Sequence, residues 1–261
     1  MPDNQLERHN LAQIEALNQR GGRMLSIVDL LLAGTVDLEM ASLLCAVVGS
    51  GASFLSGAVP GGAGKTTVMA ALLAFLPPEV ELVTVEDKGV IADAPPSSDG
   101  RRCYLAHEIG AGHFKGYIWG QAARDYLDLA RRGHLIATGL HADTLPQLRG
   151  MLLSPPINAD EQSLAALDFT LFVAAERRGS SVRRRVSAVH AGAAADAPLL
   201  FTWDGAEDRF QRHQDLDQYA PAETRQTLGA LLQDLADRKV RRLEDVRAAY
   251  LDFLSAQGGP R

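Results

Sequence analysis

Residues 56–75 read SGAVPGGAGKTTVMAALLAF, and this stretch decides how the rest of the sequence is interpreted. The glycine-rich part is preceded by ASFLSG at 52–57, which is mostly apolar and predicts a short buried strand. The residues after it have helical periodicity from Thr66 until Pro77 and Pro78 stop the helix. A strand, a glycine-rich loop and a helix in this order form the context that a phosphate-binding loop requires.

The loop itself carries the residue types that bind a polyphosphate. Backbone N–H groups surround the phosphates in such a loop, a lysine reaches the terminal phosphates, and a hydroxyl holds Mg²⁺. Lys65 and Thr66 are expected in these two roles. The usual pattern also has a glycine six residues before the lysine, where this sequence has Val59. The glycines closer to the lysine are retained, so we expect nucleotide binding by Gly61, Gly62, Ala63, Gly64, Lys65, Thr66 and Thr67.

Composition limits the classes of protein that the sequence can encode. The chain has 261 residues, 46% of them hydrophobic, which is enough for one large core with a small appendage. A net charge of -6 argues against direct nucleic-acid binding. Two cysteines exclude a disulfide framework or a four-cysteine metal site within this chain. No signal peptide or membrane span is expected, so we expect a cytoplasmic protein, with docking at the inner face of the cell membrane left open.

The order of elements predicts an α/β fold with a mostly parallel sheet covered by helices on both faces. Three parts are expected: a helical segment at 1–50, a P-loop core at 51–215 and helices at 216–261. Further strands are predicted in VELVTVED (80–87), RRCYLAHEI (101–109), HLIATGLHAD (134–143) and a hairpin at 167–192, with a helix in QAARDYLDLARRG (121–133).

Acidic residues end two of the predicted strands. Phosphoryl transfer to water needs one group that orients the water and another near Mg²⁺. Glu86 and Asp87 close the strand that follows the P-loop helix, and Glu108 closes the next apolar strand, as in a Walker B segment. We therefore expect Glu86 and Glu108 to be catalytic and Glu108 to be a metal ligand beside Thr66. The structural alternative is a solvent-exposed strand end.

Two histidines flank a third apolar strand. A strand that runs back toward the loop and ends at LHADT would bring His141 and Thr138 to the γ-phosphate, where they could report its presence. The alternative for a single histidine is a hydrogen-bonded residue of the core.

GHLIATGLHADT, at 133–144, resembles the His box of the type II/type IV secretion and pilus ATPases, which are hexameric RecA-like motors. GGAGKTT resembles their Walker A loop, VTVED their acidic box and residues 168–189 their late hairpin, so the resemblance covers roughly residues 24–192. It implies a RecA-like P-loop fold, ATP and Mg²⁺ as ligands, a homo-oligomeric ring and a membrane-embedded secretion or pilus machine as partner. It also implies that Glu86 is the catalytic acid and that His134 and His141 lie near the phosphates, with His141 catalytic and His134 nucleotide-binding.

The sequence departs from this family in two places. The Walker B acid is either Glu108, followed by an inserted loop at FKGYIWG, or it has been replaced by Gln121. The large amino-terminal domain of the family is nearly absent, which puts ring coupling in doubt. Two functions follow from the sequence, an ATPase that powers or regulates a secretion or pilus machine and, as the alternative, a degenerate ATP-binding switch with little hydrolysis. A kinase for a small molecule has no recognisable lid or acceptor pocket.

The late hairpin carries five arginines at 177–185, interpreted as a solvated charge cluster or as a contact with a neighbouring subunit.

Overall fold

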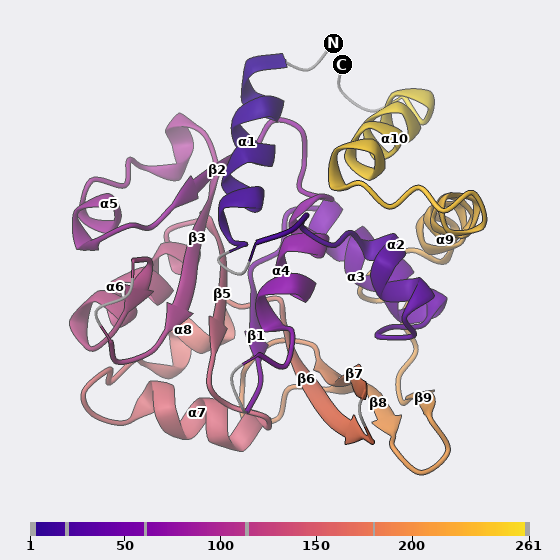
Figure 1. Cartoon of the computed structure of the whole chain (residues 1–261). Coiled ribbons are helices and arrows are strands. Elements are labelled where there is room, and N and C mark those ends of the chain that lie inside the picture. Colours follow the sequence, from indigo (N-terminus) through magenta and orange to yellow (C-terminus); the bar gives the residue numbers. More distant parts are fainter. Residues whose placement is uncertain (1–3, 19–20, 60–61, 113–114, 180, 259–261) are drawn as a thin grey trace. The chain divides into compact units, whose positions relative to one another are not determined.

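A computed structural model describes residues 4–18, 21–59, 62–112, 115–179 and 181–258 (Figure 1). The chain divides into two compact units. We call Ala52–Lys65 with Val80–Gln214 the core unit, and Met1–Gly51 with Thr66–Glu79 and Asp215–Arg261 the helical unit. The predicted division into 1–50, 51–215 and 216–261 differs from this mainly at 66–79, which the sequence placed in the core and the structure groups with the terminal helices.

The core unit is built on a mixed sheet. Parallel strands come first in the order β2-β3-β5-β1-β6, and β4 pairs with the end of β3. Antiparallel strands continue from β6 through β7 and β8 to β9. The strands are β1 (Phe54–Gly57), β2 (Glu81–Thr84), β3 (Arg102–Ile109), β4 (Tyr117–Ile118), β5 (Leu135–Leu140), β6 (Phe169–Arg178), β7 (Ser181–His190), β8 (Leu199–Asp204) and β9 (Arg209–Arg212).

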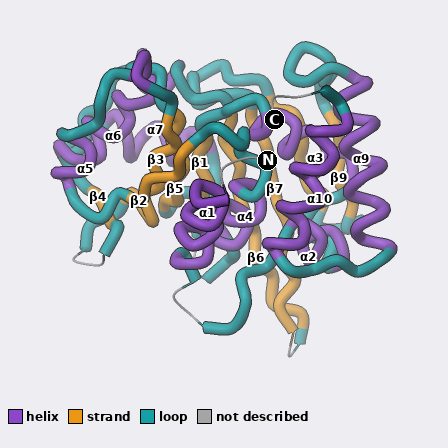
Figure 2. Tube along the Cα trace, turned by 90° about the horizontal axis from the view of Figure 1, so that it is seen from above, coloured by secondary structure: helices purple, strands orange, loops and turns teal. Residues whose placement is uncertain are grey.

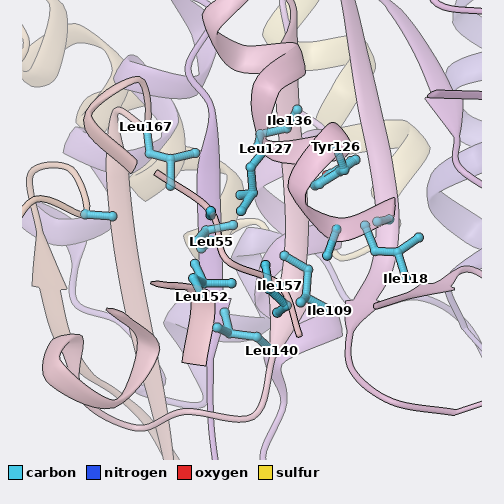
Figure 3. Close-up of a cluster of buried hydrophobic side chains, with 14 of the residues drawn as sticks. Leu55, Ile109, Ile118, Tyr126, Leu127, Ile136, Leu140, Leu152, Ile157 and Leu167 are labelled. Carbon is cyan, nitrogen blue, oxygen red and sulfur yellow. The ribbon is translucent and has the colours of Figure 1, made fainter. Parts of the chain in front are cut away.

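Short helices cover one face of the parallel strands within this unit. They are α5 (Lys88–Ala92), α6 (Gln121–Arg131), α7 (Leu145–Leu153) and α8 (Glu161–Ala165), with a 3₁₀ turn at Ser97–Asp99. Their apolar side chains pack against Leu55 of β1, Ile109 of β3 and Ile136 of β5, as Figure 3 shows. Side-chain caps fix two of the helix starts: Thr144 accepts from the N–H of Gln147, and Asp160 from that of Ser163.

The sequence missed several of these elements. Neither β8 and β9 nor α7 and α8 were predicted, and the short strand β4 lies within the segment predicted as an inserted loop. The predicted hairpin at 167–192 is present as β6 and β7.

The helical unit brings together three separate parts of the chain. It contains α1 (Asn4–Ala16), α2 (Ile27–Leu32), α3 (Leu38–Gly49), α9 (Ala222–Asp237), α10 (Leu243–Ala256) and α4 (Lys65–Leu73), of which Lys65 belongs to the core unit. Helices α3 and α9 lie side by side (Figure 2). Their close approach needs Gly229, because a Cβ there would lie 2.8 Å from Ser42 Oγ. No helix among the described residues is long and apolar enough to cross a membrane.

Candidate functional site

The loop between β1 and α4 forms the first part of the candidate site. The carboxyl end of β1 leads into it, and Lys65 is the first residue of α4. Gly62 and Gly64 have φ angles of 87° and 116°, which other residues rarely adopt, so this part of the loop depends on glycine. Ala63 is buried and Val59 is exposed. Gly61, one of the predicted nucleotide ligands, lies outside the described residues.

Three side chains predicted to act on phosphate meet at this loop. Lys65 Nζ lies 3.2 Å from Glu108 Oε2 and 3.3 Å from His141 Nδ1. His141 Nε2 lies 2.9 Å from Glu108 Oε1. If the Lys65 ammonium donates to Nδ1, the neutral ring carries its proton on Nε2, the nitrogen nearest to Glu108. The three groups form a closed triangle of polar contacts.

Burial sets the electrostatics of this triangle. Lys65 is 7% exposed and Glu108 is 5% exposed, while the His141 side chain is 48% exposed. Burial lowers the pKa of Lys65, and the charge of Glu108 and its hydrogen bond oppose that shift. A buried ammonium needs a nearby anion, and Glu108 supplies it here. An incoming phosphate could replace Glu108 as that anion, so the triangle suits a polyphosphate ligand.

A β-bulge aims Glu108 at Lys65. Strand β3 pairs Ala106 with Thr138 and Glu108 with Gly139, so His107 is an extra residue in the ladder. Without it, Ala106 and Glu108 would face the same side, where Ala106 packs in the apolar cluster beneath the helices. The bulge turns Glu108 to the opposite face.

Gly139 lies beside Lys65 on that same face. A Cβ at Gly139 would lie 3.3 Å from the His107 carbonyl oxygen and 3.6 Å from Lys65 Cε. The lysine stem therefore passes beside Gly139 of β5, and the His107 carbonyl oxygen is the atom that a side chain at Gly139 would crowd.

The sequence did not single out Tyr117, which borders Glu108. The register of β4 places Tyr117 beside Glu108 on β3. Partial burial raises the pKa of Tyr117. The charge of Glu108 raises it further, as does the hydrogen bond that Glu108 accepts from the Tyr117 hydroxyl. The only sequence signal was the aromatic YIW run, which the inserted-loop interpretation passed over.

Glu86 and Gln121 contact side chains outside the triangle. The Glu86 side chain is 55% exposed and lies 2.8 Å from Lys115 Nζ. It follows β2, which pairs with β3 and is separated from β1 by β3 and β5. Gln121 opens α6, where its amide donates to Asp125. Of the two proposed Walker B residues, Glu108 is the one that contacts Lys65.

His134 also lies away from the loop. It precedes β5, whereas His141 follows it, and seven residues of extended chain span about 20 Å. Its Nε2 lies 2.8 Å from the Pro95 carbonyl oxygen and its Nδ1 3.3 Å from the N–H of Arg102. The ring also meets Tyr104 edge-on. His134 is thus a hydrogen-bonded core histidine, at the end of the strand opposite the one predicted for a nucleotide ligand.

The remaining predicted residues lie on α4, on β5 and at the start of α5. Thr66 and Thr67 are the second and third residues of α4 and are partly buried. Thr138 is fully buried on β5, and its hydroxyl donates to the Gly139 carbonyl oxygen. Asp87 caps α5 by accepting from the N–H of Gly89.

Comparison with known proteins adds a distant similarity. No protein-family model and no curated protein matches the chain. Among solved structures, it is similar to the VirB11 ATPase from the Brucella suis type IV secretion system, determined in complex with sulphate. The identity is 20% and the TM-score 0.41, over 63% of this chain. The match spans about half (54%) of the length of that ATPase.

Proposed function

We propose that this protein binds ATP at the loop between β1 and α4 and hydrolyses it to ADP and phosphate. The observation that carries the proposal is the contact of Lys65 with both Glu108 and His141 at a strand, glycine loop and helix. The residues come from the loop and from the carboxyl ends of β3 and β5, and parallel α/β sheets bind ligands outside the carboxyl ends of their strands.

Each side chain of the triangle has a distinct task in this proposal. The loop N–H groups and Lys65 bind the phosphates, and Lys65 exchanges its contact with Glu108 for one with phosphate. Glu108, released from the lysine, orients the water whose attack on the γ-phosphorus breaks the bond to the β-phosphate oxygen. His141 contacts both Lys65 and Glu108 and can respond to the presence of the γ-phosphate.

Mg²⁺ fits the residues present. It prefers oxygen ligands and usually takes one or two protein groups, completing its shell with phosphates and water. Glu108 would supply a carboxylate, and Thr66 is the hydroxyl that the sequence predicts. When bound, the ion neutralises negative charge on the phosphates. No cluster of three or more His, Cys, Asp or Glu side chains suited to a metal occurs in the described part of the chain.

The wider role rests on the sequence resemblance alone. We propose a RecA-like ATPase of the secretion and pilus type, working as a homo-oligomeric ring on a membrane-embedded machine. The exposed position of Glu86 favours a second candidate, an ATP-binding switch with little turnover, because the acid expected to orient water is paired with Lys115. Steady-state hydrolysis measured on protein that binds ATP separates the two.

The decisive experiment is an ATP titration with two lysine variants. Lys65→Ala should weaken ATP binding by at least about a hundredfold, because it removes the buried charge at the phosphates. Lys115→Ala removes an exposed lysine of the same unit and should bind as the unaltered protein does. Circular dichroism checks that both variants are folded. Equal affinity in all three proteins would refute the proposed function.

A further inference from the structure

One arginine of the late hairpin lies over the glycine loop of its own chain. Arg184 Nη2 lies 3.5 Å from the Gly62 carbonyl oxygen, to which it donates. Its Cδ lies 3.5 Å from the position that a Cβ on Gly64 would occupy, and Val173 Cγ1 lies 3.8 Å from the same position. The methylene chain and the guanidinium of Arg184 therefore both lie against the loop just before Lys65.

The arginines on either side of Arg184 are already paired. Arg183 contacts Glu176 at 2.7 Å and Asp208 at 3.0 Å, and its guanidinium lies over the Trp203 ring. Arg185 contacts Asp208 at 2.9 Å. In contrast, no carboxylate among the described residues lies within ion-pair distance of Arg184. Its hydrogen bond is to a neutral carbonyl, and its side chain is exposed.

The hairpin register explains this division of roles. Arg184 pairs with Ala175 on β6, so it shares a face with Ala175 and Val173. Arg183 pairs with Glu176 and therefore faces the opposite side. One arginine is thus directed to the loop, while those next to it hold the hairpin and the β8–β9 turn.

We propose that Arg184 binds the phosphates of the nucleotide held by the loop of the same chain. This inference rests on the proposed function. A guanidinium presents several N–H donors in a fixed plane that matches phosphate oxygens, and its bonds to an anion are stronger than its bond to a carbonyl. Arg184 can exchange the Gly62 carbonyl for a phosphate oxygen without breaking an ion pair.

The test is ATP affinity in Arg184→Gln, with Arg177→Gln as the matched control. Arg177 pairs with Val182 on the same face of the hairpin, two residues farther from the loop, and is also exposed. Arg184→Gln should bind ATP about tenfold more weakly, as expected for the loss of a charge-assisted bond. Arg184→Lys should lie between, because it keeps the charge and loses the planar fork. Arg177→Gln should bind as the unaltered protein does.

A purely structural role would give a different result. It would lower the melting temperature of Arg184→Gln without nucleotide, whereas a phosphate ligand should leave that value unchanged and reduce the rise that ATP causes. If the unaltered protein binds ATP and Lys65→Ala does not, equal affinities of Arg184→Gln and Arg177→Gln overturn the inference and leave the proposed function standing. If the unaltered protein binds no ATP, the proposed function itself fails.

Mixing two variants tests whether Arg184 acts within its own chain. One variant, Lys65→Ala, keeps Arg184, and the other, Arg184→Gln, keeps Lys65. If Arg184 acted on a neighbouring chain, the mixture would regain the ATP affinity of the unaltered protein. We expect the affinity of the Arg184→Gln sites to stay about tenfold reduced. Recovery in the mixture would overturn the assignment within the chain.

Discussion

Lys65 holds a buried positive charge whose counter-charge comes from Glu108. Removing one partner of such a pair leaves the other charge uncompensated, and this costs more than the pair contributes. Glu108 therefore has two opposing effects in the proposal. It stabilises the protein without nucleotide, and it competes with phosphate for the lysine.

Glu108→Gln should separate these effects. Without ATP, we expect the variant to melt several degrees lower, since the loss of the carboxylate costs about 1–3 kcal/mol and each kcal/mol shifts the midpoint by about 2–4 °C at this size. ATP should restore most of this loss and bind at least as tightly as before, because a competing negative charge is gone. Hydrolysis should fall at least about a hundredfold, as when a positioned base is removed.

Glu86→Gln is the matched control for this change. It removes the same charge from an exposed carboxylate that contacts Lys115, so turnover should change little. Phosphate release assays measure both variants. The opposite result, with Glu108→Gln active and Glu86→Gln inactive, would return the catalytic role to the residue that the family resemblance implies.

Among the secondary-structure elements, the bulge in β3 could not be predicted from the sequence. The pattern of CYLAHEI predicted an apolar strand ending in Glu108, and this strand is present. Alternation alone would place Ala106 and Glu108 on one face. The extra residue, His107, is visible only in the pairing of β3 with β5, because register depends on contacts between distant parts of the chain. The same limit applies to Arg184: the sequence shows that the residue is charged, but it does not show which way the side chain points.

The turn between β8 and β9 is held by Asp208, which gives a prediction about acid. Its carboxylate accepts from Arg185 at 2.9 and 3.0 Å and from the indole N–H of Trp203 at 2.9 Å. The hydrogen bonds from Arg185 and then Trp203 hold the pKa of Asp208 well below its usual range. A pKa lowered by folding means stability that is present above the unfolded-state pKa, about 3.9, and is lost as the pH falls toward the folded-state value.

Asp208→Asn should therefore matter at neutral pH and much less in acid. Asn tolerates the positive φ of 51° at this position, so the change isolates the charge. We expect the variant to melt at a lower temperature at pH 7, with the difference from the unaltered protein shrinking below about pH 4. Thermal melts at a series of pH values measure this difference. The contributions of the other titrating carboxylates are the same in both proteins and cancel in it. A constant difference down to pH 2 would show that Asp208 acts through its shape instead of its charge.

At the scale of the whole molecule, the two ends of the chain form one unit. The sequence predicted helices at 1–50 and 216–261 as separate appendages. In the structure, Arg247 Nη2 of α10 lies 2.7 Å from Glu7 Oε1 of α1, and Arg247 also donates to the carbonyl oxygens of Ala74 and Leu76 beyond α4. Local periodicity cannot reveal such pairing, since it repeats within each helix and carries no information about which helices meet.

Assembly into a ring is the part of the proposal that the hairpin charges bear on most directly. Arg183 and Arg185 are paired within the chain with Glu176 and Asp208, so two of the five arginines that the sequence offered to a neighbour are already engaged. Arg184 contacts Gly62 in the glycine loop of its own chain. Nucleotide at the loop is the proposed signal that forms the ring.

Light scattering at high protein concentration tests this dependence. With a non-hydrolysable ATP analogue, we expect the mass to rise from one chain to a multiple of it, because a ligand that binds the assembled form better shifts the equilibrium toward that form. Lys65→Ala with the same analogue should keep the mass seen without nucleotide, since it lacks the charge that binds the phosphates. A mass of one chain in protein shown to be saturated with the analogue would leave the motor without its ring, and the nucleotide-binding switch would then be the better account of this site.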